Sequence, residues 1–145
     1  MKWFIHASIY VALSINIIAI CVIAYWLLWP YQVIANDPTK LIEVFNSSKV
    51  VHAGGLLNMR GNTIQLTTGV IVTVNRELRN GVVIQYPETT YITDGKPFLS
   101  HQLLTIPEYT PPGDYFMEFI SQYHVNPIRD VIIHRRSETF KVIAP

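Results

Sequence analysis

The chain has 145 residues, half of them hydrophobic, and its 11 Lys and Arg residues nearly balance its 10 Asp and Glu residues. This near-neutral charge gives no reason to expect a nucleic acid as partner. The only cysteine, Cys21, excludes a disulfide within the chain, and it lies in an apolar stretch. We therefore expect no thiol chemistry in the rest of the protein.

The first element in chain order is that apolar stretch, Trp3–Tyr31, which contains no Asp, Glu, Lys or Arg. A helix needs about 20 apolar residues to cross ~30 Å of hydrocarbon, and this run is longer. Aromatic rings, which favour the headgroup layer, lie at both ends, and Pro30 stops the helix at the second end. These aromatic residues are Trp3 at one end and Tyr25, Trp26, Trp29 and Tyr31 at the other. Residues 1–31 are thus predicted to form a transmembrane signal anchor.

Two alternatives to a retained anchor stay open. A buried helix of a soluble protein is one, although so long an uncharged run is rare in a small soluble domain. A cleaved signal peptide is the other, with Val33 and Ala35 at a small-residue cleavage site. The apolar run is, however, far longer than the ~7–15 residues of a signal peptide's apolar region.

The orientation of the anchor depends on the basic residues that flank it. Lys2 precedes the helix while Lys40 and Lys49 follow it, so the positive-inside comparison is almost a tie. We expect the amino terminus inside, because a two-residue head has no evident exported role. The following domain would then be extracytoplasmic, either periplasmic or extracellular.

One narrow face of the predicted helix carries small or polar side chains at helical spacing. Small residues let a second helix approach closely, and Asn can hydrogen-bond across such a contact at about 0.5–2 kcal/mol. The candidate helix-contact residues are Ser8, Ala12, Asn16 and Ala19. Chance placement is equally open, because small residues are common in spanning helices. The expected partners are the lipid bilayer and either another membrane protein or a second copy of the chain.

A short polar linker, residues 32–40, is expected to keep the next domain close to the bilayer. Beyond it, β-rich runs alternate with turn residues about every 8–12 positions, which predicts about seven to nine strands in an all-β sandwich or barrel over residues 41–145. Asn80-Gly81 is the strongest hairpin signal. The β-rich runs are residues 41–45, 49–53, 56–60, 63–67, 70–78, 82–86, 89–93, 98–106, 115–125, 131–135 and 139–143.

The run 115–125 shows the clearest alternation of apolar and polar side chains. One face is predicted to lie in the core, and the Tyr123 hydroxyl is expected to be paired near the core's edge. The residues of that face are Tyr115, Met117, Phe119, Ser121 and Tyr123.

The residues at the start of this run resemble the tyrosine corner of immunoglobulin-like sandwiches. There the pattern is Asp-x-Gly-x-Tyr-x-Cys at the start of the penultimate strand. Gly113 and Tyr115 match its Gly and Tyr, whereas Pro111 replaces the Asp and Met117 the Cys. The resemblance implies that the Tyr115 hydroxyl bonds backbone just upstream and fixes the loop between the sheets.

The same resemblance implies a fold: a membrane-anchored immunoglobulin-like β-sandwich in the loose sense, as in bacterial and phage surface modules. The run 115–125 would be the penultimate strand, and residues 131–143 would contain the last. The core Trp and Cys of antibody domains are missing from this part of the sequence.

No motif indicates catalysis, a metal site or a cofactor. The histidines in the β region show no ligand spacing such as H-x-H or H-E-x-x-H, and no cysteine accompanies them. The sequence also has no G-x-S-x-G, no glycine-rich phosphate loop and no evident pair of carboxylates for acid–base work. We therefore expect neither an enzyme nor a bound cofactor.

Two stretches are candidates for surface contacts. His134, Arg135 and Arg136 are adjacent and would suit lipid phosphates or an acidic partner, unless they are ordinary strand residues paired with carboxylates. The loop before Tyr115 is the other candidate, because its prolines reduce the entropy lost on docking, although the same prolines would also stiffen a purely structural connection. The residues of this interaction loop are Tyr109, Pro111, Pro112 and Asp114.

These features lead to two functional hypotheses. The first is a single-pass structural or accessory subunit whose sandwich and helix contact other proteins in a larger membrane or virion assembly. The second is a membrane-tethered binding protein for a small ligand or carbohydrate, which requires one pocket lined by aromatic rings. The rings available for such a pocket are Tyr86, Tyr91, Tyr109 and Tyr123.

Overall fold

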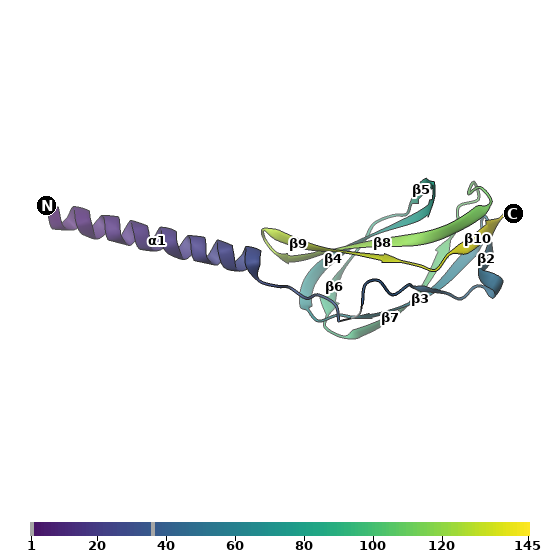
Figure 1. The fold of residues 1–145 in the computed structure, drawn as a ribbon, viewed down its shortest axis with the longest axis horizontal. Helices are drawn as coiled ribbons and strands as arrows, with labels where there is room; N and C mark the ends of the chain where they lie inside the picture. Colours follow the sequence, from purple (N-terminus) through teal and green to yellow (C-terminus); the bar gives the residue numbers. More distant parts are fainter. Residues whose placement is uncertain (1, 36) are drawn as a thin grey trace.

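A computed structural model describes residues 2–35 and 37–145, and the side chains of residues 6–35, 37–96 and 101–145. One helix, α1 (Lys2–Leu28), extends from one end of an elongated β domain (Figure 1). Its last turn closes with a 3.0 Å bond from the Trp29 N–H to the Tyr25 carbonyl, just before Pro30. The Trp3 side chain, which was expected to mark the first end, lies outside the described residues.

The apolar side chains of α1 are not buried against the β domain. The segment His6–Leu28 spans 23 residues at a mean hydropathy of 2.4, and none of its most apolar window is buried. Ile9, Leu13, Ile17 and Ile20 are each at least half exposed. A helix packed in the core of the β domain would show the opposite, so α1 is not a core helix of this sandwich. The helix is long and apolar enough to cross a membrane.

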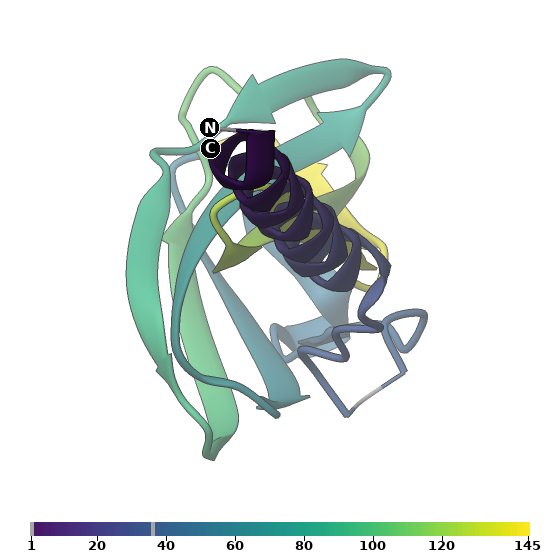
Figure 2. The ribbon, with the colours of Figure 1, turned by 90° about the vertical axis from the view of Figure 1, so that its left-hand side faces the viewer.

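The β region forms two packed sheets, in line with the predicted sandwich. Figure 2 views the molecule from the helix side, with α1 in front of the sandwich end. One sheet has the order β1-β3-β7, and the other has the order β2-β10-β8-β4-β5, with β6 beside β4 and β9 beside β8. The strands are β1 (Glu43–Val44), β2 (Val50–His52), β3 (Leu56–Ile64), β4 (Thr68–Asn80), β5 (Val82–Gln85), β6 (Thr89–Asp94), β7 (Pro97–Thr105), β8 (Gly113–Asn126), β9 (Arg129–Arg136) and β10 (Phe140–Ile143).

The core fills the space between the two sheets, and alternate side chains of β8 lie at its centre. Tyr115, Met117, Phe119 and Tyr123 are all buried, as predicted, whereas Ser121 is half-buried. Leu57 and Met59 of the smaller sheet pack against these side chains. The strands on either side of β8 in the large sheet contribute Leu78, Phe140 and Val142. The predicted all-β sandwich after an apolar helix is therefore confirmed.

Two runs that the sequence separates at Gly61-Asn62 form one strand. β3 pairs residue for residue with β7, from Leu56 opposite Thr105 to Ile64 opposite Pro97. Gly61 is buried within that strand and lines a small cavity opposite Phe119. Gly61 thus lies inside a paired strand and does not mark a turn.

The last part of the chain runs beside β8 as a broken strand. β9 pairs with residues 118–126 of β8, and β10 pairs with residues 113–115. Between them, the Ser137 N–H donates to the Met117 carbonyl and the Ser137 hydroxyl accepts the Met117 N–H. The chain thus stays bonded to β8 across the break, and the two β-rich runs predicted within residues 131–143 form the two strands β9 and β10.

The Asn80-Gly81 hairpin is present, with Asn80 paired to Val82 across the turn. Gly81 adopts φ +66°, which favours glycine, whereas Asn80 has no positive φ. The predicted turn position is therefore right, but only one of its two residues takes the left-handed conformation that the pattern suggested.

The segment expected as a linker, residues 32–40, is partly built into the sandwich. Val33 and Ile34 are 2% and 6% exposed and pack with Val72 and Tyr123 in a second core cluster. Ile34 bridges to Gln65, and backbone hydrogen bonds on either side of it extend the end of β3. The connection between helix and core is consequently limited to residues 29–32.

Candidate functional site

The tip of the β8–β9 hairpin is joined to the end of α1. The last carbonyls of a helix have no partner within it and need donors from elsewhere. The Asn126 amide donates to the Trp26 carbonyl at 3.1 Å. The Arg129 guanidinium donates to the Leu27 and Trp29 carbonyls at 2.8 and 2.7 Å. A cation in this position also interacts favourably with the helix dipole.

Neighbouring groups leave Arg129 available for these carbonyls. The guanidinium lies 6.0 Å from the centre of the Tyr31 ring, within range of a cation–π contact. The adjacent carboxylate, Asp130, is occupied by Gln122 at 2.6 Å and by His124 at 2.8 Å. These hydrogen bonds lower the pKa of Asp130, with Gln122 the larger cause, so it stays ionised without binding Arg129.

This junction is the site that sequence reasoning missed. Arg129 follows a turn in the sequence, and nothing in its spacing indicates that it reaches a helix about 100 residues earlier. An apolar helix whose last turn has no basic residue is the one available signal, because its carbonyls require an outside donor.

The tyrosine corner forms as the resemblance implied. The Tyr115 hydroxyl donates to the Pro111 carbonyl at 2.9 Å, and Tyr115 is 2% exposed. The interaction loop lies at the end of the sandwich away from α1 (Figure 1). Tyr109 is 76% exposed, and Pro111, Pro112 and Asp114 are also exposed. The loop thus combines a fixed backbone with an aromatic ring in solvent.

The structure separates the three adjacent basic residues of β9. Arg135 points between the sheets, where it donates to the Thr63 hydroxyl at 2.6 Å. His134 and Arg136 lie on the outer face: His134 is 3.3 Å from a Glu118 oxygen, and the Arg136 guanidinium lies 3.6 Å from the centre of the Phe116 ring. The three side chains therefore do not form a joint anionic contact.

The four candidate helix-contact residues lie along the exposed helix, and each of them is exposed. The Asn16 amide donates at 2.8 Å to the Ala12 carbonyl of its own helix. The described part of the β domain does not cover this face.

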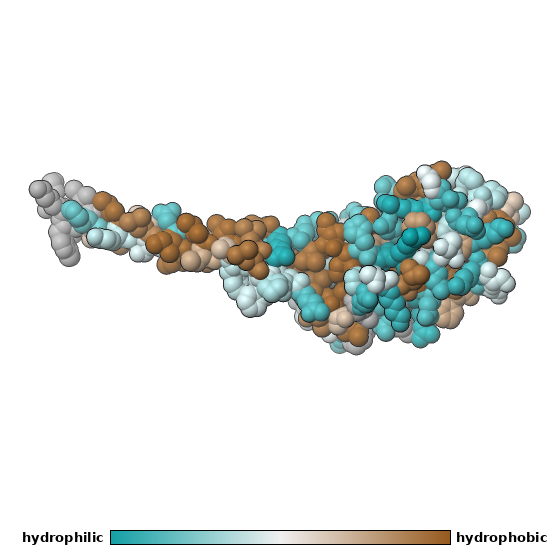
Figure 3. Space-filling model, in the orientation of Figure 1, coloured by the Kyte–Doolittle hydropathy of each residue, from teal (hydrophilic) through white to brown (hydrophobic). Residues whose placement is uncertain are grey.

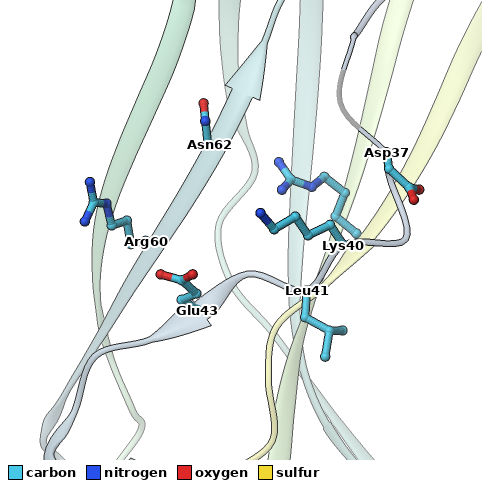
Figure 4. A pocket seen from close by; sticks show the side chains of 7 residues that line it. Asp37, Lys40, Leu41, Glu43, Arg60 and Asn62 are labelled. Carbon is cyan, nitrogen blue, oxygen red and sulfur yellow. The ribbon is translucent and has the colours of Figure 1, made fainter.

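A polar recess opens between the 37–43 segment and β3 (Figure 4). Its volume is about 270 Å³, and it is lined by Asp37, Lys40, Leu41, Glu43, Arg60, Asn62 and Arg135. The Asp37 carboxylate accepts hydrogen bonds from Thr39, and it points away from the other labelled polar groups. The recess therefore presents three cations against the single remaining carboxylate of Glu43.

The four tyrosines that were expected to line one pocket fall into two separate pairs. Tyr91 and Tyr123 share a hydrogen bond between the sheets, beside a cavity of about 80 Å³. Tyr86 donates to the Thr105 carbonyl at 3.0 Å and lies near Tyr109. Burial, with a smaller contribution from Tyr109, raises the pKa of Tyr86 to about 12. The aromatic pocket of the ligand-binding hypothesis is not formed by these rings.

Among the described side chains, no three His, Cys, Asp or Glu residues come together as metal ligands would. Three of the histidines have other partners: His52 contacts the Ala144 carbonyl, His124 contacts Asp130, and His134 contacts Glu118. Each of these contacts involves one ring nitrogen, Nδ1.

No protein-family model matches the chain, and no curated protein matches its sequence. Among solved structures, the chain is similar to the CARDB domain of the PF1109 protein from Pyrococcus furiosus, determined in complex with di-metal ions. The two share 14% identity at a TM-score of 0.46, over 80% of this chain and 99% of that domain. A likeness of this extent assigns no ligand, metal or activity to the present chain.

Proposed function

We propose that the chain is a single-pass membrane protein that holds a β-sandwich against the membrane surface as a structural or accessory subunit of a larger assembly. The observation that carries the proposal is the helix itself: 23 residues at mean hydropathy 2.4 with its most apolar window uncovered by the domain. Burying so much apolar surface in a bilayer is strongly favourable, whereas leaving it in water is not.

The short connection supports a role close to the membrane. Because Val33 and Ile34 are core residues, the four residues before them reach at most about 14 Å. The sandwich is therefore confined to the region next to the bilayer. The interaction loop, which carries Tyr109, lies at the end of the sandwich away from α1, where it would contact a neighbouring protein in the assembly.

The helix is the second contact surface of this proposal. The Ser8, Ala12, Asn16 and Ala19 stripe would allow a partner helix, or a second copy of α1, to approach closely. We assign the amino terminus to the inside and the sandwich to the periplasmic or extracellular side, and we assign no catalytic step to the protein. Surface modules of bacterial or phage assemblies are the class that this combination fits.

Two measurements test the proposal. The full chain should remain in the membrane fraction after alkaline carbonate extraction, and crosslinking in the native membrane should capture a defined protein or a second copy of the chain. Asn16→Leu should weaken that association without loss of insertion, whereas Ser14→Leu, elsewhere on the helix, should not. Extraction by carbonate, or a monomer that captures nothing, would contradict the proposal.

The polar recess supports a second candidate function, retention of a small acidic ligand such as an acidic sugar. Lys40 and Arg60 border it, and the Arg135 Nε atom is buried without a hydrogen-bond partner. Calorimetric titration of the full chain in detergent with glucuronate and with inorganic phosphate should show binding that Lys40→Ala weakens and Lys96→Ala does not. Absence of heat with both probes would exclude this function for these ligand classes.

A further inference from the structure

The β8–β9 turn lies level with the last turn of α1, close to its aromatic residues. Asn126 bonds the Trp26 carbonyl and Arg129 bonds the Trp29 carbonyl, so the two ends of the turn are tied to two points on the helix end. Residues 26 and 29 are separated by about 4.5 Å along a helix axis. The turn between them therefore lies at the depth of Trp26 and Trp29, whose rings favour the headgroup layer.

The turn presents an apolar side chain at that depth. Ile128 is 48% exposed, and its N–H is held by the Asn126 side chain at 3.1 Å. Exposed isoleucines also lie on the same end of the large sheet, where Ile71 of β4 pairs with His124 of β8 on one side and with Ile92 of β6 on the other. Figure 3 shows hydrophobic side chains gathered where the sandwich adjoins the helix.

The occupant of this surface follows from its continuity with the helix. The apolar surface of α1 ends at Leu28, which is 79% exposed, and Arg129 of the turn bonds the carbonyl of the adjacent Leu27. A bilayer that surrounds the end of α1 therefore also reaches the turn that carries Ile128. At the opposite end of the sandwich, Val82 and Val83 are 55% and 51% exposed, but they lie far from the helix. Exposure of apolar side chains alone does not distinguish the two ends; attachment to the helix does.

We propose that the β8–β9 turn inserts Ile128 into the headgroup layer of the bilayer that α1 enters, with Asn126 and Arg129 fixing the sandwich to the helix end. The partner of this surface is lipid, not protein. The inference rests on the proposed membrane function, since it needs α1 in a bilayer, and it adds the orientation of the sandwich and a second membrane contact 100 residues from the anchor.

An environment-sensitive fluorophore at position 128 tests the contact. The full chain would carry Cys21→Ser and Ile128→Cys, labelled with a nitrobenzoxadiazole probe and reconstituted into phosphatidylcholine vesicles with spin-labelled lipid as quencher. The matched control is Val83→Cys, whose native side chain is equally apolar and equally exposed. The probe at 128 should emit at shorter wavelength and be quenched several-fold more strongly than the probe at 83.

Parallel carbonate extraction separates the failure of this inference from failure of the proposed function. A chain that stays in the membrane while position 128 behaves like position 83 overturns the lipid contact alone. A chain that is extracted overturns the anchor. A probe shielded from both water and quencher in native membranes, but aqueous in pure lipid vesicles, would mean that a protein covers the turn and would overturn the inference as well.

Arg129→Ala in the labelled chain tests how the turn is held. Loss of the two carbonyl bonds should reduce quenching at position 128 several-fold, whereas Lys141→Ala, which removes an exposed cation on β10, should leave it unchanged. Unchanged quenching in Arg129→Ala would contradict the role given to Arg129. Near-ultraviolet circular dichroism of each variant shows that the sandwich is still folded.

Discussion

The Val44 N–H donates to the Glu138 carboxylate at 3.0 Å, which ties β1 of the smaller sheet to the turn before β10 of the larger sheet. Backbone hydrogen bonds from Ile42 to the Arg136 carbonyl and from Glu138 to the Ile42 carbonyl continue this connection. Lys49 adds an ion pair with the same carboxylate at 2.9 Å. One edge of the sandwich is thus closed by a segment that belongs to both sheets.

This connection predicts a pH-dependent stability. The Val44 N–H, followed by Lys49, lowers the pKa of Glu138 below its ordinary value of 4.5. A lowered carboxyl pKa stabilises the folded state above about pH 4.5, and this stabilisation is lost as the pH falls through the folded-state value. Glu138→Gln should cost about 1 kcal/mol at neutral pH and should flatten the loss of stability in acid.

The measurement is urea unfolding of the full chain in a mild detergent, followed by near-ultraviolet circular dichroism between neutral pH and about pH 3. Glu88→Gln, at an exposed position, serves as the control. An unfolding midpoint that depends on pH equally in Glu138→Gln and the unmodified chain would contradict this prediction.

The tyrosine corner predicts a second stability change. Tyr115→Phe keeps the buried ring but removes the hydroxyl that bonds the Pro111 carbonyl, so it should destabilise the sandwich by about 1–2 kcal/mol in the same unfolding measurement. Tyr109→Phe, at a side chain 76% exposed, should change the stability by less than about 0.5 kcal/mol. Equal effects of the two substitutions would show that the corner bond does not stabilise the fold.

Local patterns sufficed for most of this architecture. Alternation gave the buried face of β8, and the short motif around Gly113 and Tyr115 gave the corner bond, because each depends on neighbours in sequence. Gly61 failed as a turn signal because β3 pairs with β7 on both sides of it. Whether the chain turns at a glycine in a β-rich run or continues as a strand depends on a pairing strand far away in sequence.

The candidate site was less accessible from sequence for the same reason. One part of it could have been predicted: adjacent residues such as Arg135 and Arg136 point to opposite faces in a strand, because side chains alternate with a period of two. The helix-capping contacts of Arg129 depend on how the β8–β9 hairpin meets α1. No spacing rule connects residues about 100 positions apart.

The packing of residues 33–34 predicts that the segment after the helix stabilises the sandwich. Ile34→Ala removes a side chain that is 6% exposed in the second core cluster, so it should cost about 2–4 kcal/mol. Gln32→Ala, at an exposed position only two residues earlier, should be nearly neutral. The unfolding midpoint in urea distinguishes a structural segment from a free linker, which would tolerate both changes equally.

The tyrosines predict a loss of stability in alkali. Burial raises the pKa of Tyr86 to about 12 and also raises that of Tyr123, against an ordinary value of 10. A raised pKa means that the folded state holds the proton more tightly, so the stabilisation is complete below pH 10 and is lost as the pH rises towards 12. Tyr86→Phe keeps the ring but cannot ionise, and its stability should therefore fall less steeply between pH 10 and about pH 12. Tyr10→Phe, on the exposed helix, should behave like the unmodified chain.

The measurement follows tyrosinate absorbance together with the circular dichroism of the sandwich, which reveals whether ionisation and unfolding coincide. Ionisation of all tyrosines near pH 10 with the sandwich intact would contradict the burial of these hydroxyls.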